Sequence, residues 1–205
     1  RRLRRSSLPN HWIMGATIGA DVDSRDHVWL VQRNTFDQFA GRTELGSAQD
    51  PVLSECCSPA PPVLEFDPDG NLVGSWGGPT DTGEWEWPTS NHGITVDHMD
   101  NVWIGGNGAG DSHALKFTRG GEFLLQVGVA GRDPDSLSLD SFGRIAKISV
   151  DGPENEIYFA DGYGNKRVAV VDADTGEVKR FWGAYGNEPD DSDRQRYTPG
   201  GPPLQ

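Results

Sequence analysis

The sequence is poor in basic residues and has no long apolar run. Lys and Arg together number 18 against 31 Asp and Glu, so the formal net charge of the 205 residues is −13. Such a chain repels a phosphate backbone, which disfavours nucleic-acid binding as a main role. No stretch approaches the roughly 20 consecutive apolar residues that span a bilayer, and the arginine-rich residues 1–5 precede no apolar run. The sequence therefore predicts a soluble protein that is not embedded in a membrane.

Cysteine is also scarce. The two cysteines, Cys56 and Cys57, are adjacent. They can form a vicinal disulfide, remain thiols or pair outside the chain, and two thiols are too few for an all-sulfur structural zinc site. We favour a structural role for this pair over redox chemistry. The pair leaves the compartment open, with a secreted or periplasmic location among the candidates.

Helical periodicity is missing, because no window shows sustained apolar spacing at i, i+3, i+4 and i+7. Glycine (27 residues) and proline (14 residues) are frequent and lie among seven Trp, eight Phe and four Tyr. Aromatic side chains at this density need a buried core, which excludes plain disorder, and no Gly-X-Y period indicates collagen. The length suits one domain. We therefore expect a single domain that consists almost entirely of β-strands.

The chain resembles itself at intervals. Residues 18–30 and 92–104 align with six identical positions, namely Gly, Val, Asp, Asp, Val and Trp, and residues 146–159 form a weaker third copy. In each copy an alternating apolar run meets an acidic turn and then a second β-rich run, which is typical of a hairpin. Two further short runs follow each hairpin. Repeated units of four short antiparallel strands predict the blades of a β-propeller.

Three complete blades can be counted, at about residues 18–78, 92–128 and 145–186. Closed propellers usually have about four to eight blades. Residues 1–17 could supply one closing strand through Trp12 and Ile13, and residues 187–205 form a Pro- and Gly-rich tail or inter-blade loop. We expect the three blades to be part of a six-bladed ring. Either further blades of a longer polypeptide or a partner chain would cover the open blade faces.

Three segments carry a family resemblance: residues 28–33 (Val-Trp-Leu-Val-Gln-Arg), 88–97 (Pro-Thr-Ser-Asn-His-Gly-Ile-Thr-Val-Asp) and 160–167 (Ala-Asp-Gly-Tyr-Gly-Asn-Lys-Arg). The units resemble NHL-type repeats. Residues 18–186 are similar to the catalytic core of the peptidyl-α-hydroxyglycine α-amidating lyase family and to its uncharacterised bacterial relatives, which are six-bladed propellers. NHL repeats occur in enzymes and in binding scaffolds, so the repeat alone predicts no activity.

The resemblance implies a zinc-assisted cleavage of a carbinolamide into an amide and glyoxylate, with a small-molecule or peptide substrate in the propeller channel. It implies a zinc ligand at His92, a catalytic tyrosine at Tyr163 and a catalytic arginine at Arg33. A phenol can take a hydroxyl proton and a guanidinium can bind a carboxylate. The sequence departs from the family at Gln32, where the lyase has His, and the family's remaining zinc ligands belong to later blades.

Each of these residues has a structural alternative. His92 could line the channel and bond a neighbouring blade, Tyr163 could fill the gap between blades, and Arg33 could pair with one of the many acids. Four more residues are predicted to contact a ligand at the channel rim: Trp85, Trp87, Asn107 and His113.

The acidic turns raise calcium as a second candidate ion, because Asp23, Asp97, Asp67 and Asp172 each have a second aspartate nearby in the sequence. The EF-hand pattern is absent. We favour hydrogen bonds from these side chains to the turn backbone. The aromatic residues that recur at one repeat position, Trp29, Trp103 and Tyr158, are predicted to pack in the core.

Two functions follow. The first is a metal-dependent carbon–nitrogen lyase of the amidating type. The second is a non-catalytic propeller module that binds a protein or a ligand within an assembly. Retention of Arg33, His92 and Tyr163 favours the first function, and the lack of later-blade histidines favours the second.

Overall fold

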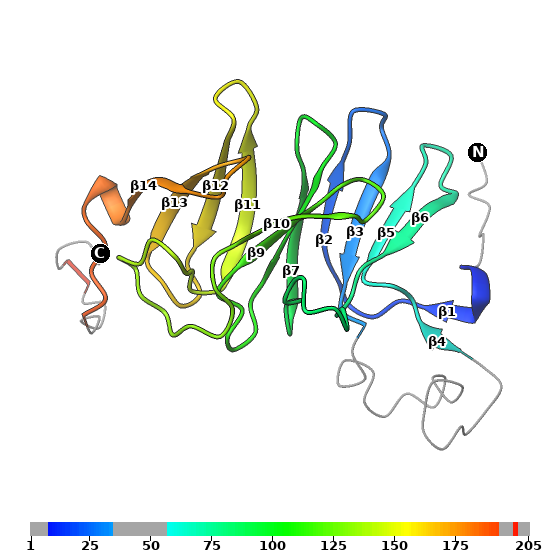
Figure 1. Ribbon diagram of the computed structural model, residues 1–205, viewed down its shortest axis with the longest axis horizontal. Coiled ribbons are helices and arrows are strands. Elements are labelled where there is room, and N and C mark those ends of the chain that lie inside the picture. Colours follow the sequence, from blue (N-terminus) through cyan, green and yellow to red (C-terminus); the bar gives the residue numbers. More distant parts are fainter. Residues whose placement is uncertain (1–7, 35–56, 193–198, 201–205) are drawn as a thin grey trace, which may run out of the picture.

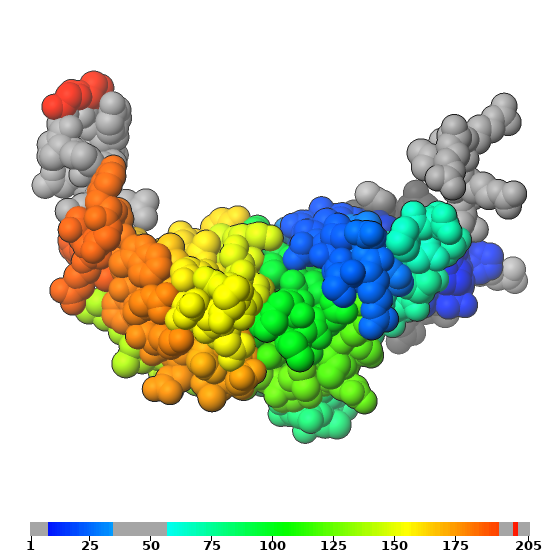
Figure 2. Space-filling model, turned by 90° about the horizontal axis from the view of Figure 1, so that it is seen from above, coloured from blue at the N-terminus to red at the C-terminus, as the bar shows by residue number. Residues whose placement is uncertain are grey.

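The computed structural model describes residues 8–34, 57–192 and 199–200. Three four-stranded sheets follow one another along the chain, and every strand pair within them is antiparallel (Figure 1). The sheets are arranged like propeller blades, which confirms the expected all-β propeller architecture. Seen from above, they lie next to one another in an arc (Figure 2). Among the described residues, no helix is long and apolar enough to cross a bilayer.

The strands of each blade pair in the order of the sequence. Blade 1 consists of β2 (Thr17–Val22), β3 (Val28–Gln32), β5 (Val63–Phe66) and β6 (Leu72–Trp76). Blade 2 consists of β7 (Asn91–Val96), β8 (Val102–Gly106), β9 (Ala114–Phe117) and β10 (Phe123–Val127). Blade 3 consists of β11 (Ile145–Asp151), β12 (Glu156–Asp161), β13 (Arg167–Asp172) and β14 (Val178–Trp182). The first strands adjoin one another, because β7 contacts both β2 and β11.

Two short 3₁₀ helices, η1 (Pro9–His11) and η4 (Ala184–Gly186), flank the blades. Trp12 and Ile13, the residues considered for a closing strand, form β1 (Trp12–Ile13). This strand pairs in parallel with β4 (Ser58–Pro59) in a separate two-stranded sheet. The segment ahead of blade 1 is therefore held by the end of the long β3–β5 connection and by Gln32 of β3, whose Oε1 accepts a hydrogen bond from the N–H of Gly15.

The acidic turns explain why the repeat keeps its aspartate and its tryptophan. Oδ1 of Asp97 accepts hydrogen bonds from two backbone N–H groups of its turn, and Oδ2 accepts one of 3.0 Å from the indole of Trp103. Asp23 binds its own turn and the indole of Trp29 in the same way. One carboxylate thus closes the hairpin and orients the buried aromatic ring, which confirms the turn interpretation.

Apolar side chains fill the two spaces between neighbouring blades. Between blades 1 and 2, Trp29 and Val31 pack with Ile94, Ile104 and Phe117, and all five are at most 1 % exposed. Between blades 2 and 3 the buried cluster includes Trp103, Ala114, Phe142, Ile148, Ile157 and Phe159. Each sheet therefore buries a face against its neighbour, as the predicted core role of Trp29 and Trp103 requires.

Basic side chains connect the blades beside these cores. Arg119, in the β9–β10 turn of blade 2, forms ion pairs with Asp23 and Glu65 of blade 1, and its guanidinium lies over the ring of Trp29. Lys116 of blade 2 donates a hydrogen bond of 2.8 Å to the carbonyl of Ala173 in blade 3. These contacts fix the angle between blades and so the shape of the face on which the predicted site residues lie.

Candidate functional site

The two predicted catalytic residues, Arg33 and Tyr163, and the predicted ligand-binding residue Asn107 follow the same strand in three consecutive blades. Arg33 comes directly after β3, Asn107 directly after β8, and Tyr163 shortly after β12. His92 is the second residue of β7, whose first residue pairs with the last residue of β8. Antiparallel pairing puts all four at one end of the blades, opposite the acidic hairpin turns that lie at the top of Figure 1.

His92 and Tyr163 meet across the boundary between blades 2 and 3. The Tyr163 hydroxyl lies 3.0 Å from Nε2 of His92, and the two rings are nearly perpendicular with centroids 5.2 Å apart. The other ring nitrogen of His92, Nδ1, is buried without a hydrogen-bond partner. Tyr163 itself is 51 % exposed. A half-exposed phenol from blade 3 is therefore in direct contact with an imidazole from β7 of blade 2.

Arg33 reaches from blade 1 to blade 2. Its Nε donates a hydrogen bond of 3.3 Å to the carbonyl of Asn91, and its Nη2 donates one of 3.0 Å to Oδ1 of Asn107. The same oxygen of Asn107 accepts a hydrogen bond from the hydroxyl of Ser90. The guanidinium thus lies next to the residue that precedes His92, and Asn107 orients it.

A pocket of about 210 Å³ lies between blades 1 and 2, with Arg33 and Trp87 in its wall. Asn34, Pro79, Pro88, Thr89 and Asn91 complete its lining. Two of the residues predicted to contact a ligand or substrate, Arg33 and Trp87, therefore line one concave surface. We call it the Arg33 pocket.

Trp85 is half-buried and His113 is buried, and both have contacts within the protein. The Trp85 ring stacks on Phe123 with centroids 5.4 Å apart and meets Phe117 edge-on. His113 is 2 % exposed, and its Nε2 lies 2.5 Å from the carbonyl of Glu86. Burial lowers the pKa of His113, although the Glu86 carbonyl opposes this shift. Both contacts fix the segment that leads to Trp87, so a ligand contact is not needed to explain either residue.

Asp111 organises the loops around this end of blade 2, and sequence reasoning missed it. Its carboxylate, 1 % exposed, accepts hydrogen bonds from the backbone N–H groups of Thr89, Ser90 and Gly108 and from the Thr89 hydroxyl. A Cβ atom at Gly108 would collide with that hydroxyl. The glycine-rich run before Asp111 is the signal that could have identified this network.

Blade 3 has a comparable network inside the segment 160–167. Asp161 accepts hydrogen bonds of 2.6 Å from the N–H of Gly143, 2.7 Å from Asn165 and 2.8 Å from Arg167. Burial raises the pKa of Asp161 despite these donors. Arg167 also binds the carbonyls of Ser136, Ser138 and Ser141. Most of this segment therefore anchors the loop between blades 2 and 3, and Tyr163 projects from the anchored part.

The described residues contain one group with the spacing of a metal site, and it lies among the acidic turns. Asp23, His27 and Glu65 bring their ligand atoms within 4.8 Å of one another. The guanidinium of Arg119 lies in this group, since it pairs with Asp23 and Glu65 and its Nη2 is 3.0 Å from Nδ1 of His27. A cation of the protein therefore already neutralises these carboxylates.

Hydrogen bonds dominate the ionisation of Asp23. Burial alone raises its pKa, but bonds from the Trp29 indole, from two backbone N–H groups and from Arg119 outweigh burial and lower the pKa to about 2. Hydrogen-bond donors of the protein already occupy the carboxylate oxygens of Asp23. Calcium at this turn remains a prediction, and the ion would have to displace these donors.

Cys57 is disulfide-bonded, and its structural role remains a prediction. It lies next to β4, in the segment that leads into blade 1. Cys56 is outside the described residues.

Comparison with known proteins supports the fold and gives no family. No protein-family model matches the chain, and no curated protein matches it by sequence. Among solved structures, the β-propeller virginiamycin B lyase of Staphylococcus aureus is 18 % identical with a TM-score of 0.50 over 85 % of this chain. A streptogramin B lyase is 17 % identical over 89 % of this chain, with a TM-score of 0.47.

This likeness extends over less than half of the matched proteins. The chain covers 43 % of the virginiamycin B lyase chain and 44 % of the streptogramin B lyase chain. Identities this low show a shared fold, and the reaction of a propeller depends on the residues of its site. The structural match therefore supports a propeller, whose function has to be argued from Arg33, His92 and Tyr163.

Proposed function

We propose that this chain belongs to an NHL-type propeller enzyme that cleaves a carbon–nitrogen bond in the manner of the amidating lyases. The proposal rests above all on one observation, the 3.0 Å contact between the Tyr163 hydroxyl and Nε2 of His92. It is supported by Arg33 at the same end of the blades and by the resemblance of residues 28–33, 88–97 and 160–167 to that family.

The proposed substrate is a carbinolamide with a carboxylate, such as a peptide that ends in α-hydroxyglycine. Its bond between Cα and the amide nitrogen breaks, the hydroxyl oxygen loses its proton as the carbonyl of glyoxylate forms, and the nitrogen gains a proton. Tyr163 would accept the substrate's hydroxyl proton as its own phenolic proton passes to Nε2 of His92, 3.0 Å away. Arg33 would hold the carboxylate through the guanidinium edge that faces its pocket.

The proposal includes zinc only if residues outside the described part of the chain supply further ligands. A catalytic zinc normally takes three protein ligands and keeps one open position. Among the described residues no group of three ligand atoms within 4.8 Å of one another includes His92, and its Nε2 lies 3.0 Å from the Tyr163 hydroxyl. This donor set does not hold zinc by itself, so we assign no step to the metal. Further blades, from the same polypeptide or from a partner chain, would complete both the ring and the ligand set.

One observation favours a second function, a propeller module that binds a ligand or protein without turnover. The Arg33 guanidinium is bonded to Asn91 and Asn107, which is the arrangement expected if its role is to join blades 1 and 2. In that case the Arg33 pocket would bind a ligand with an apolar part against Trp87, and Tyr163 would have no chemical role.

Release of glyoxylate from a peptide that ends in α-hydroxyglycine tests the lyase proposal. We expect Tyr163→Phe to lower kcat by about 100-fold, the order expected for loss of a general acid or base. Tyr185→Phe is the matched control, because Tyr185 is 76 % exposed in η4, beyond the outer strand β14 of blade 3, and should keep full activity. No glyoxylate release by zinc-loaded protein whose ring is completed by the further blades or the partner chain would reject the lyase and favour the binding module.

A further inference from the structure

The blades contact one another through a common set of strand positions. At each boundary the later blade turns these positions toward the earlier blade, and every one of them is apolar. In blade 2 the set consists of Ile94, Val96, Val102, Ile104, Leu115, Phe117 and Phe123. In blade 3 it consists of Ile148, Val150, Ile157, Phe159, Ala169, Val171 and Val178. Each of these blades therefore buries one apolar face against the blade before it.

Blade 1 has apolar residues at the same positions, although no blade precedes it in the described part of the chain. The strand register identifies them, because Ala20 pairs with Leu30 as Ile94 pairs with Ile104. The set, which we call the leading face, consists of Ala20, Val22, Val28, Leu30, Leu64, Phe66 and Leu72. Apart from the buried Leu64, these residues are half-buried or exposed, and Val22 is 54 % exposed. An apolar outer face on a terminal repeat needs a cover.

The other end of the arc carries the matching half of a boundary. Trp29 and Trp76 of blade 1 meet edge-on with ring centroids 6.4 Å apart, and Phe117 of blade 2 packs on Trp76. Tyr158 and Trp182 hold the same strand positions in blade 3 and also meet edge-on at 6.4 Å. Both rings are half-buried, and the described residues contain no fourth blade to cover them. The trailing face, as we call this surface, consists of Tyr158, Ala160, Val168 and Trp182.

The turn between the last two strands of a blade also reaches over the blade before it. The Trp76 indole of blade 1 donates a hydrogen bond of 3.2 Å to the carbonyl of Arg119 in blade 2. Lys116 of blade 2 donates one of 2.8 Å to the carbonyl of Ala173, the equivalent turn residue of blade 3. At both boundaries, a side-chain donor of the earlier blade therefore binds the same backbone carbonyl of the later blade.

The open faces have both halves of this contact. Pro68 is the equivalent turn residue of blade 1, because Asp67 and Thr118 close their turns with the same backbone hydrogen bond. Trp182 of blade 3 is the equivalent of Trp76. Within the described part of the chain, the Pro68 carbonyl accepts no hydrogen bond and the Trp182 indole donates none. A donor on the trailing face thus matches an acceptor beside the leading face.

The charges at the open faces agree with this match. In blade 1, Asp23 and Glu65 are paired with a cation of the next blade, Arg119. In blade 3, Glu156 is already paired with Arg180 of its own blade. A blade that covers blade 3 therefore needs no arginine at the turn position, where blade 1 has a proline.

We propose that a second copy of this chain covers both faces, with blade 3 of each copy docked on blade 1 of the other. The Trp182 indole then donates its hydrogen bond to the Pro68 carbonyl of the second copy. Head-to-tail contacts of this kind close into a ring when the rotation allows it. Closed propellers have about four to eight blades, and copies of this chain add blades in threes. Two copies are the only number that falls within this range.

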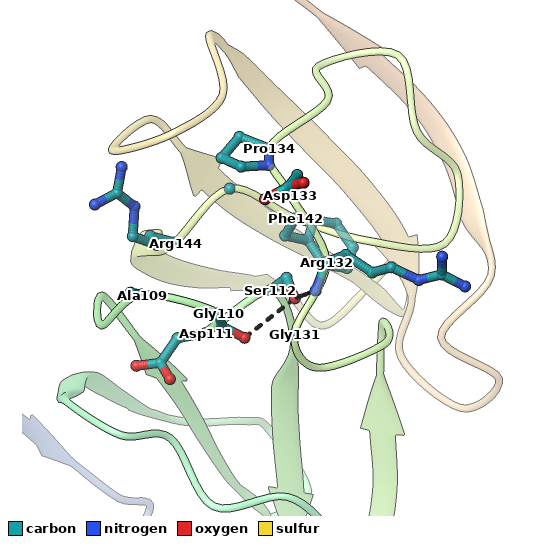
Figure 3. A pocket seen from close by; sticks show the side chains of 11 residues that line it. Ala109, Gly110, Asp111, Ser112, Gly131, Arg132, Asp133, Pro134, Phe142 and Arg144 are labelled. Carbon is teal, nitrogen blue, oxygen red and sulfur yellow. Dashed lines mark hydrogen bonds between the residues drawn. The ribbon is translucent and has the colours of Figure 1, made fainter.

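The contact between copies lacks one feature of the contacts within the chain, the connecting loop. Between blades 2 and 3, the N–H of Arg132 fixes this loop with a hydrogen bond of 3.0 Å to the hydroxyl of Ser112, and the loop borders a pocket of about 270 Å³ (Figure 3). Arg144, whose φ is +67°, ends the loop, and the guanidinium groups of both arginines extend away from the pocket. No such connection joins two copies, so their association should depend on concentration.

Sedimentation equilibrium of the full chain measures this association. Over about 1–100 µM chain, the mean mass should rise from one chain of 22.3 kDa toward two chains and no further. A monomer over the whole range would overturn the inference and leave the two faces to blades of another polypeptide. Growth beyond two chains would contradict closure into a ring. Glyoxylate release is not part of this readout, so the inference holds or fails independently of the lyase proposal.

Three variants locate the contact between copies. Val22→Glu puts a charge on the leading face and should weaken dimer formation about 100-fold. Trp182→Phe keeps an aromatic ring on the trailing face, removes the indole N–H and should weaken dimer formation about tenfold. Val129→Glu is the matched control, because Val129 is 43 % exposed after β10, outside both faces, and should change nothing. Dimers that only one of the two face variants weakens, or that Val129→Glu weakens equally, would contradict head-to-tail docking.

Discussion

The indole nitrogen of Trp29 donates a hydrogen bond of 2.9 Å to Oδ2 of Asp23, six residues earlier in the chain. Asp23 in turn holds Arg119 of the next blade, whose guanidinium lies over the Trp29 ring at 5.3 Å from its centre. The local hairpin and the contact between blades 1 and 2 therefore depend on the same carboxylate.

This relationship predicts a loss of stability in acid. The pKa of Asp23 is about 2 in the folded chain and lies below its unfolded value, so the carboxylate stabilises the fold above about pH 4. That contribution, about 2 kcal/mol, disappears as the pH falls through the folded pKa. Asp23→Asn should remove this part of the acid sensitivity, as measured by urea unfolding at pH 7 and at pH 3.

The exposed Asp69 of the β5–β6 turn provides the control for Asp23. Asp69→Asn makes the same chemical change where no arginine of the next blade is bound. It should leave the pH dependence of the free energy of unfolding as it is in the unmodified chain. Equal pH profiles for Asp23→Asn and the unmodified chain would contradict the role given to Asp23.

The Asp161–Arg167 pair predicts a large stability loss when one partner is removed. Both side chains are fully buried, and Nε of Arg167 lies 2.8 Å from Oδ2 of Asp161. Arg167→Met leaves a buried carboxylate without its cation and should lower the free energy of unfolding by about 3–5 kcal/mol. Arg180→Met, which breaks the more exposed pair with Glu156, should cost much less. Urea unfolding of both variants measures the difference, and similar losses would contradict this reading of burial.

His113 predicts a second pH dependence, in the weakly acidic range. Burial lowers its pKa below the ordinary histidine value of 6.5, so the folded chain favours the neutral ring. The free energy of unfolding should therefore fall as the pH drops below about 6.5, because the unfolded chain binds the proton more readily. His113→Gln keeps a donor for the Glu86 carbonyl and should remove this dependence, whereas the exposed His98→Gln should not. Thermal unfolding at pH 7.5 and pH 5.5 measures the pH dependence of stability in each variant. A loss of this dependence in His98→Gln but not in His113→Gln would contradict the role given to His113.

Local chemistry explains why the sequence predicts so much of the fold. Hairpin turns, strand alternation and the Asp–Trp pair depend on residues within one copy of the repeat, such as Asp97 and Trp103. The same logic predicts that Arg33 and Tyr163 share one end of the blades, since each comes directly or shortly after the second strand of its unit.

Contacts between distant segments explain what the sequence could not predict. Asp111 holds residues more than 20 positions away, and Arg119 binds Glu65 and Asp23 in another blade. Trp85 packs against Phe117 and Phe123, contacts that its place in a loop before His92 does not signal. The left-handed backbone of Arg144 depends on Asp161 and Gly164, and no local motif signals it.

The contact between His92 and Tyr163 is tested most directly by the ¹⁵N chemical shift of Nε2 in His92. Removal of the hydroxyl in Tyr163→Phe should move this signal, because the phenol lies 3.0 Å from that nitrogen. Tyr185→Phe should leave it in place. An Nε2 signal that is identical in the unmodified chain and in Tyr163→Phe would show that the two side chains do not meet, and the proposed site at this end of the blades would lose its central pair.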